Sequence, residues 1–142
     1  MKTVRDLLKT KEGEVYTINS SQTVYEALLL LAEKNIGALP VLEEKRLVGI
    51  MSERDYARKV ILKGASSLDT MVKKIMTGSL ITVSPRTKLE KCLDIMSERH
   101  VRHLPVLEKE ELIGLVSIGD LVKVLMEKKD RLINKLSNTS ST

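Results

Sequence analysis

The chain has 142 residues, with 24 Lys and Arg against 19 Asp and Glu and a net charge of +5. Its apolar residues are aliphatic apart from 3 Tyr, which argues against proteins that stack the bases of single-stranded nucleic acid on aromatic rings. No apolar run approaches the roughly 18 residues of a membrane span, and the start of the chain does not resemble an export signal, so no membrane partner is expected.

In the first half of the chain, the pattern predicts a lead-in, an extended stretch, a helix, two strands and a second helix. The predicted ranges are 3–8 for the lead-in, 15–18 for the extended stretch, 24–34 for the first helix, 38–42 and 47–51 for the strands, and a start near Arg54 or Asp55 for the second helix. Thr23 is a suitable N-cap for the first helix, with Glu26 as its capping-box partner. The charged link 43–46 suits an antiparallel hairpin, although it lacks the Asn-Gly of a tight turn.

The same order of elements recurs 65 positions later, where Pro105 corresponds to Pro40. The two halves align without a gap from about Tyr16 to about Val60. The second copy has its lead-in at 70–76, its extended stretch at 80–83, its first helix at 89–99, its strands at 103–107 and 112–116, and the start of its second helix near Gly119 or Asp120.

A repeat of this length predicts an α/β (α+β) fold in which two β-α-β-β-α repeats pack face to face about a pseudo-two-fold axis. One copy alone would expose a face of its sheet, so the two copies are expected to form one cooperative unit. The expected division is 1–65 for the first repeat with its lead-in, 66–136 for the second with its linker and C-terminal helix, and 137–142 for a disordered polar tail. Any site at the junction should occur twice.

Other features of the sequence do not indicate a catalytic or metal site. Cys92 aligns with Ala27 on the inner face of a helix and is expected to be a buried structural thiol, and a single cysteine fits a reducing, cytoplasmic location. His100 and His103 are three residues apart across a change from helix to strand, a spacing that does not hold two imidazoles on one metal ion. No phosphate loop and no nucleophile with an acid–base partner is evident, so the sequence favours a protein that is not an enzyme.

At its repeated motifs the chain closely resembles the tandem cystathionine-β-synthase (CBS) domain pair, also called the Bateman module. One signature is the Leu-Pro-Val strand at 39–41 and 104–106; the other is Gly, two apolar residues, Ser, two further residues and Asp at 49–55 and 114–120. The resemblance covers about residues 1–130 and implies a non-catalytic sensor that binds an adenosyl ligand between the repeats. AMP, ADP, ATP, NAD(H) and S-adenosylmethionine are the candidate regulatory ligands, with AMP or ATP favoured. It also implies a homodimer, and since no effector domain is fused here, an effector protein on another chain.

The resemblance further implies which residues bind the ligand. Asp55 and Asp120 would accept hydrogen bonds from ribose hydroxyls, and Ser52 and Ser117 would contact ribose or phosphate. Residues of the first strand would frame the base, here Thr17 with Ile18 and Thr82 with Val83. The two residues before Leu-Pro would face the phosphates, here Gly37 with Ala38 and Arg102 with His103.

Elementary chemistry supports the role of the two aspartates. A cis-diol offers two donors, and a carboxylate can accept both of them while it also caps the start of a helix. The simpler interpretation is that each Ser-x-x-Asp is a helix cap and nothing more.

The two copies differ where phosphate is expected, because Arg102 and His103 have no basic counterparts at Gly37 and Ala38. We expect Arg102 and His103 to enter the cleft of Ser52 and Asp55 and make it the better phosphate site, with the other cleft weaker, empty or suited to a less charged ligand. Alternatively, Arg102 and His103 are only exposed residues at the start of a strand. Arg54 is placed either to neutralise phosphate or to pair with Glu53 or Glu26.

Two other functional classes stay open. One is an interaction scaffold whose clefts bind no nucleotide. The other is a nucleic-acid-binding protein, suggested by the charge of +5 and disfavoured by the even mixing of acids and bases along the chain.

Overall fold

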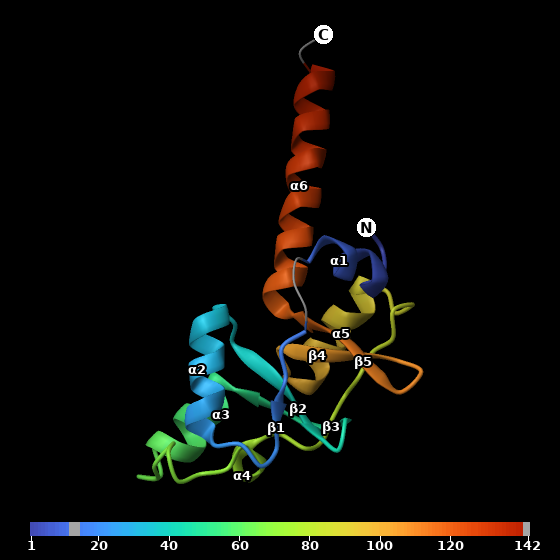
Figure 1. Cartoon of the computed structure of the whole chain (residues 1–142). Helices are drawn as coiled ribbons and strands as arrows, with labels where there is room; N and C mark the ends of the chain where they lie inside the picture. The colour runs from blue at the N-terminus through green and yellow to red at the C-terminus, as the bar shows by residue number, and fades with distance from the viewer. Residues whose placement is uncertain (12–14, 141–142) are drawn as a thin grey trace.

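The computed structural model describes residues 1–11 and 15–140, and the burial of side chains as far as residue 137. Its elements, in chain order, are α1 (Val4–Thr10), β1 (Ile18–Asn19), α2 (Val24–Lys34), β2 (Ala38–Glu43), β3 (Arg46–Ser52), α3 (Glu53–Tyr56), the π-helical turn η1 (Ala57–Ile61), α4 (Val72–Ile75), α5 (Leu89–Arg99), β4 (His103–Glu108), β5 (Glu111–Ser117) and α6 (Ile118–Ser140). They form two lobes, one built on β1–β3 with α2, α3 and α4, and the other on β4 and β5 with α1, α5 and the base of α6 (Figure 1). The predicted fold of two related repeats is confirmed.

Each lobe is organised by an antiparallel hairpin with the same register. Leu39 pairs with Met51 in β2–β3, and Leu104 pairs with Val116 in β4–β5. The extended stretches predicted at 15–18 and 80–83 pair over a much shorter length. Ile18 and Asn19 alone form β1 beside β2, and the second lobe has a single parallel bridge from Val83 to Val106. Two residues shortly before each of these points lie outside the strands and line the clefts between the lobes, namely Val15 with Tyr16 and Leu80 with Ile81.

Both hairpins turn on charged residues with left-handed backbone. Glu44 and Lys45 have φ of 50° and 68°, and Lys109 and Glu110 have φ of 50° and 67°. Two successive left-handed residues give the twist that joins antiparallel strands tightly, a geometry for which Asn-Gly is the usual sequence. The hairpins therefore form without that signal.

Hydroxyl caps at Thr23 and Ser52 begin α2 and α3, whereas α5 follows Lys88, which makes no side-chain cap hydrogen bond. The Thr23 hydroxyl accepts the backbone N–H of Glu26, and α2 and α5 cover the predicted ranges. Helices α3 and α6 begin at Glu53 and Ile118, slightly before the predicted starts, because the N-cap is the preceding serine. Helix α6 continues to Ser140, into the range expected to be a disordered tail, and residues 141–142 of that range lie outside the described residues.

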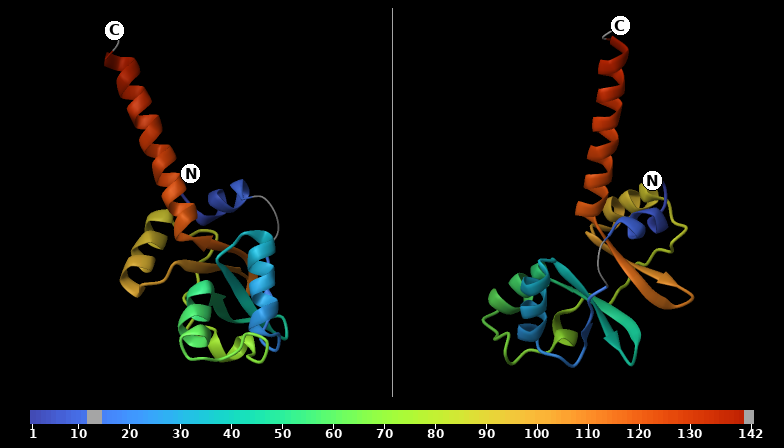
Figure 2. Two further views of the ribbon diagram at one scale, coloured as in Figure 1. Left: turned by 90° about the vertical axis from the view of Figure 1, so that its left-hand side faces the viewer. Right: turned by 45° about the horizontal axis from the view of Figure 1, so that its top comes forward.

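Each lead-in segment packs in the core of the repeat that it does not precede. Val4 and Leu7 of α1 are buried with the second repeat, whereas Val72 and Ile75 of α4 are buried with the first. Matching backbone hydrogen bonds fix both segments: the Val4 N–H donates to Thr87 O at 2.9 Å, and the Val72 N–H donates to Gln22 O at 2.9 Å. The right-hand view of Figure 2 shows α1 beside α5 in the second lobe. A division of the sequence at 65/66 therefore does not coincide with the two cores.

Candidate functional site

Two clefts of similar build lie at the junction of the lobes. Cleft 1 has a volume of about 510 Å³ and contains Ser52 and Asp55; cleft 2 has about 570 Å³ and contains Ser117 and Asp120. Both volumes lie within the range of small-ligand sites, which is about 300–1,000 Å³. Cleft 1 is lined by Gly37, Ile50, Ser52, Glu53, Arg54, Asp55, Arg58, Lys59, Thr77, Ser79, Leu80, Ile81, His100, Val101, Arg102 and His103. Cleft 2 is lined by Leu8, Lys11, Val15, Tyr16, Asn35, Ile36, Gly37, Ala38, Arg102, His103, Ile113, Gly114, Leu115, Ser117, Ile118, Gly119 and Asp120.

The serine and aspartate of each cleft form a reciprocal cap at a helix start. The Ser52 hydroxyl accepts the Asp55 N–H at 3.2 Å, and Asp55 Oδ2 accepts the Ser52 N–H at 2.9 Å. Ser117 and Asp120 repeat the arrangement, at 3.1 Å and 2.9 Å. A carboxylate has about four acceptor positions, so the cap leaves Asp55 and Asp120 able to accept further hydrogen bonds from the cleft.

A lysine ammonium contacts each of these carboxylates. Lys59 Nζ lies 3.1 Å from Asp55 Oδ1, and Lys11 Nζ lies 2.9 Å from Asp120 Oδ2. Burial opposes ionisation of the Asp120 carboxyl, but the Ser117 N–H and the Lys11 ammonium together hold its pKa below the usual value. Asp120 is therefore ionised at neutral pH.

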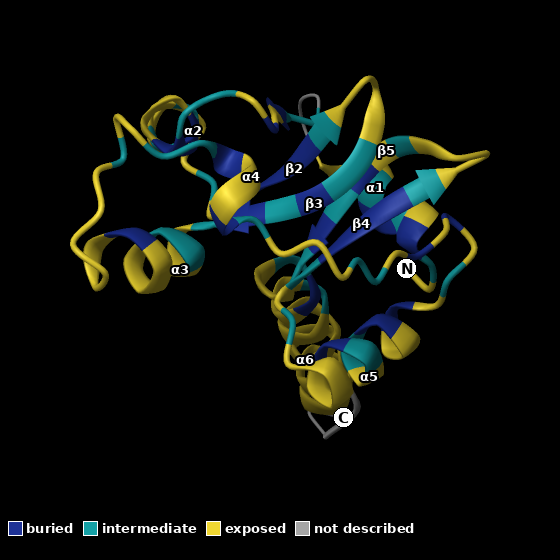
Figure 3. Cartoon of the chain, turned by 90° about the horizontal axis from the view of Figure 1, so that it is seen from below, coloured by how far each residue is buried: buried dark blue, intermediate teal, exposed yellow. Residues whose placement is uncertain are grey.

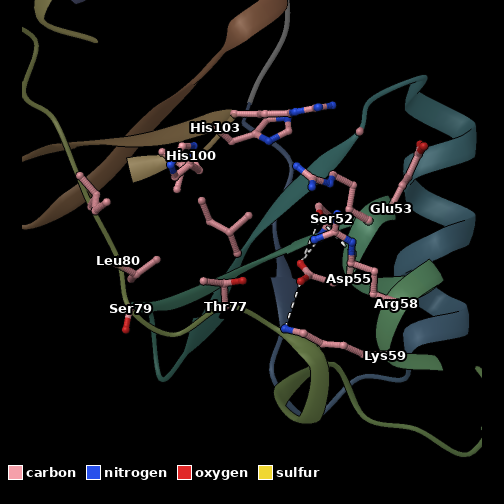
Figure 4. Close-up of a pocket in the computed structure, with 16 residues that line it drawn as sticks. Ser52, Glu53, Asp55, Arg58, Lys59, Thr77, Ser79, Leu80, His100 and His103 are labelled. Atoms are coloured by element: carbon pink, nitrogen blue, oxygen red, sulfur yellow. Dashed lines mark hydrogen bonds and ion pairs between the residues drawn. The ribbon is translucent and has the colours of Figure 1, made fainter. Parts of the chain in front are cut away.

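Arg102 and His103 line both clefts. In cleft 1, His103 lies across from the Ser52–Asp55 cap (Figure 4). Burial lowers the pKa of His103, an effect that Asp120 opposes and that Lys11 and Arg102 reinforce. His103 is therefore neutral at pH 7 and offers cleft 1 a hydrogen-bonding imidazole, while Arg102 supplies the charge.

Cleft 1 is the more cationic of the two. Its described lining holds Arg54, Arg58, Lys59 and Arg102 against Glu53 and Asp55. The described lining of cleft 2 holds Lys11 and Arg102 against Asp120. Arg54 reaches cleft 1 and makes no ion pair with Glu53, Glu26 or any other described residue.

The first-strand residues expected at the base lie elsewhere. Ile18 and Val83 are buried in the two cores, and neither they nor Thr17 and Thr82 line a cleft. The clefts receive the residues two positions earlier, Val15 with Tyr16 and Leu80 with Ile81. The reason is the parallel pairing with β2 and β4, which draws Ile18 and Val83 into the sheets. Ala38, although buried, lines cleft 2 as expected for a residue before Leu-Pro.

Sequence reasoning missed the two lysines and Arg58. Lys59 and Arg58 follow Asp55 on the same helical turn, so their positions after the motif could have indicated them. Lys11 is 109 residues away from Asp120 along the chain, and no local pattern indicates that contact.

Metal and membrane features are missing from the described part of the chain. In residues 1–11 and 15–140, no group of three or more His, Cys, Asp or Glu side chains is arranged to hold a metal ion. Over the same residues, every helix is too short or too polar to cross a bilayer.

Comparison with protein families identifies the chain. The family model of the CBS domain matches residues 3–62 and again residues 72–127, so the chain belongs to the CBS domain family and carries a tandem pair. This confirms the resemblance seen in the repeated motifs. CBS domain pairs are regulatory modules, and the proteins that carry them are generally non-catalytic.

Relatives in both sequence and structure agree with this assignment. The mitochondrial CBS domain-containing protein CBSX3 of Arabidopsis thaliana is 38% identical over 144 residues, covering 95% of this chain and 70% of that protein. The CBS domain-containing protein YhcV of Bacillus subtilis is 31% identical over 141 residues, covering 99% and 91%. A solved protein with CBS domains from Burkholderia ambifaria is 47% identical with a TM-score of 0.85, covering 88% of this chain and 94% of that one. The CBS domain pair of protein MJ0100, solved with 5′-methylthioadenosine and S-adenosyl-L-methionine, is 26% identical with a TM-score of 0.79, covering 89% and 97%.

Proposed function

We propose that this protein is a non-enzymatic sensor that binds a phosphorylated adenosine ligand, AMP or ATP, in cleft 1 and passes its occupancy to a partner protein. The observation that carries the proposal is the meeting, in one cleft, of the Ser52–Asp55 cap with Arg54, Arg58, Lys59 and Arg102. The cap offers a carboxylate to a ribose diol, and the cations offer charge to phosphate. The MJ0100 pair, solved with two adenosyl compounds, supports the ligand class.

Cleft 2 is proposed as the weaker site. It has the same Ser117–Asp120 cap but fewer cationic side chains among its described lining residues. A ligand that contacts residues of both lobes stabilises one relative orientation of the repeats by its differential affinity, and that orientation is the signal read by the partner.

The single cysteine supports a reducing, cytoplasmic location.

The first test measures thermal unfolding of the wild type, Asp55→Asn and Asp120→Asn with AMP, ATP, NADH or S-adenosylmethionine. A ligand at 100 times its Kd should stabilise the fold by about 2.7 kcal/mol, which raises the Tm of a domain of this size by about 9 °C. AMP or ATP should give the largest shift, and Asp55→Asn should remove most of it. The asparagine keeps an oxygen for the Ser52 N–H, so the helix cap survives the change.

Asp69→Asn is the matched control, because Asp69 is exposed and lines neither cleft. It should respond to ligand as the wild type does. If none of the four ligands raises the Tm of the wild type, the sensor proposal is wrong and an interaction scaffold becomes the better description.

A homodimer formed through α6 is proposed as the state in which the sensor works. The helix projects from the body, as Figures 1 and 2 show, and its surface is largely exposed (Figure 3). Its exposed apolar residues recur every three or four positions and form a stripe: Val122, Leu125, Met126, Leu132, Ile133 and Leu136. Lys129 lies within the stripe, where its aliphatic stem can pack while its ammonium reaches water.

Charge supports a second copy of this chain as the occupant of the stripe. By helical spacing, Lys128 and Lys135 lie along one edge of the stripe, and Asp130 and Lys123 lie along the other. In a parallel pair of helices, one edge of the first helix faces the opposite edge of the second. Lys128 of each copy would then face the edge of its partner that carries Asp130.

Sedimentation equilibrium tests the dimer. The wild type should have twice the chain mass of 15.9 kDa, and the double variant Leu132→Glu, Ile133→Glu should sediment as a monomer because its charges would be buried without partners. Arg131→Glu adds a similar charge on the polar face of α6 and should stay dimeric. A monomeric wild type, or a dimeric double variant, would contradict the α6 interface.

A further inference from the structure

We infer that Lys59 in cleft 1 and Lys11 in cleft 2 are the specificity-determining residues that make each cleft prefer phosphorylated adenosyl ligands to neutral ones. The inference rests on the proposed function, since it concerns ligands of the same two clefts. It adds two residues that belong to no CBS motif identified in the sequence and gives them one shared role.

The two lysines occupy equivalent places in the two clefts, although they come from different parts of the chain. Lys59 lies on η1, and the corresponding position in the second repeat is Val124. Lys11 follows α1, the lead-in that packs on the second repeat. The two lysines are therefore not equivalent positions of the repeat. Each cleft has its own lysine beside its aspartate, from a different part of the chain.

Each of the two ammonium groups also donates a hydrogen bond to a backbone carbonyl. Besides its aspartate, Lys59 Nζ donates to Ile75 O at 2.8 Å, and Lys11 Nζ donates to Leu115 O at 2.7 Å. An ammonium has three N–H donors, so one donor on each lysine remains for a group in the cleft. Both Ile75 and Leu115 are parts of buried or half-buried elements, and their carbonyls hold the lysines in position at the cleft wall.

The electrostatic consequence follows from the distances. A ribose-binding carboxylate repels the phosphate of the ligand that it binds, because the two anions share one cleft. An ammonium 2.9–3.1 Å from the carboxylate offsets that repulsion and offers its free N–H to an anion. A neutral nucleoside gains no binding free energy from this ammonium, so the lysine makes the cleft favour charged ligands over neutral ones.

Adenosine and AMP are suitable probes, since AMP is adenosine with one phosphate added. Binding is measured calorimetrically in backgrounds that leave one cleft intact: Lys59→Met in Asp120→Asn, and Lys11→Met in Asp55→Asn. Each methionine variant should raise the Kd for AMP by about tenfold or more, the size expected for a charge-assisted hydrogen bond, and change the Kd for adenosine by less than about twofold.

Two exposed lysines near the test residues serve as controls. Lys63 follows η1, and Lys9 lies on α1. The variants Lys63→Met and Lys9→Met each remove one positive charge outside the clefts and should leave the Kd for AMP unchanged. If Lys59→Met and Lys11→Met change the Kd values for adenosine and AMP equally, the lysines only shape the clefts and this inference is wrong, while the proposed function stands. If the wild type binds neither compound, both fail.

Discussion

Replacing Leu7 by alanine is expected to weaken the second repeat, although Leu7 precedes the first repeat in the sequence. Leu7 is 3% exposed and packs in the core that holds Leu104 and Val116. Loss of its side chain from that core should lower the free energy of unfolding by about 2–5 kcal/mol. Amide hydrogen exchange should accelerate most in β4 and β5, which measures where the loss falls.

Ile75→Ala provides the reciprocal comparison. Ile75 is 2% exposed, follows the first repeat in sequence and packs in the core of Leu39 and Met51. Its loss should be of similar size, and exchange should accelerate most in β2 and β3. Faster exchange mainly in β2 and β3 for Leu7→Ala, and mainly in β4 and β5 for Ile75→Ala, would contradict this arrangement of the lead-ins.

Gly49→Ala is expected to lower the free energy of unfolding by about 1–3 kcal/mol, as overpacking of a core does. A Cβ at this position would lie 2.7 Å from Met76 Sδ and 2.9 Å from Thr77 O. The Thr77 backbone cannot withdraw easily, because it exchanges two hydrogen bonds with Ile50 at 2.8 and 3.0 Å. Denaturant unfolding of the wild type and the variant measures the effect.

Gly114→Ala is the matched variant in the second repeat. There the added Cβ meets the Leu8 side chain, at 2.6 Å from Cδ2 and 2.9 Å from Cδ1. The end of a leucine can change rotamer where a backbone carbonyl cannot, so the loss should be clearly smaller than that of Gly49→Ala. Equal losses in the two variants would mean that the Thr77 carbonyl is free to move.

The fold was predictable from the sequence because most of its signals are local. The apolar spacing of α2 and α5 gave both ranges, and the repeated Ser-x-x-Asp placed two helix starts and two cleft carboxylates. The exchange of lead-ins was not predictable in this way. Val4 with Leu7 and Val72 with Ile75 have the same spacing, so either pair suits either core.

The site was predictable where a motif carries it and not where the chain folds back. Asp55, Asp120, Arg102 and His103 lie at the clefts, as their places in the repeat indicated. The residues predicted to frame the base do not line a cleft, and the lining residues lie two positions earlier in the chain. Parallel pairing places Ile18 and Val83 in the sheets, and that pairing depends on β2 and β4 and not on the local sequence. The place of Lys11 in cleft 2 was not predictable, because its contact with Asp120 joins residues that are 109 positions apart in the sequence.

The packing of each lead-in on the other repeat also determines how such a chain can be divided into fragments. A fragment ending at residue 65 would keep α1, which belongs to the other core, and lose α4, which completes its own. A fragment of residues 15–76 would keep its core whole, so it is the better candidate for expression as a single repeat.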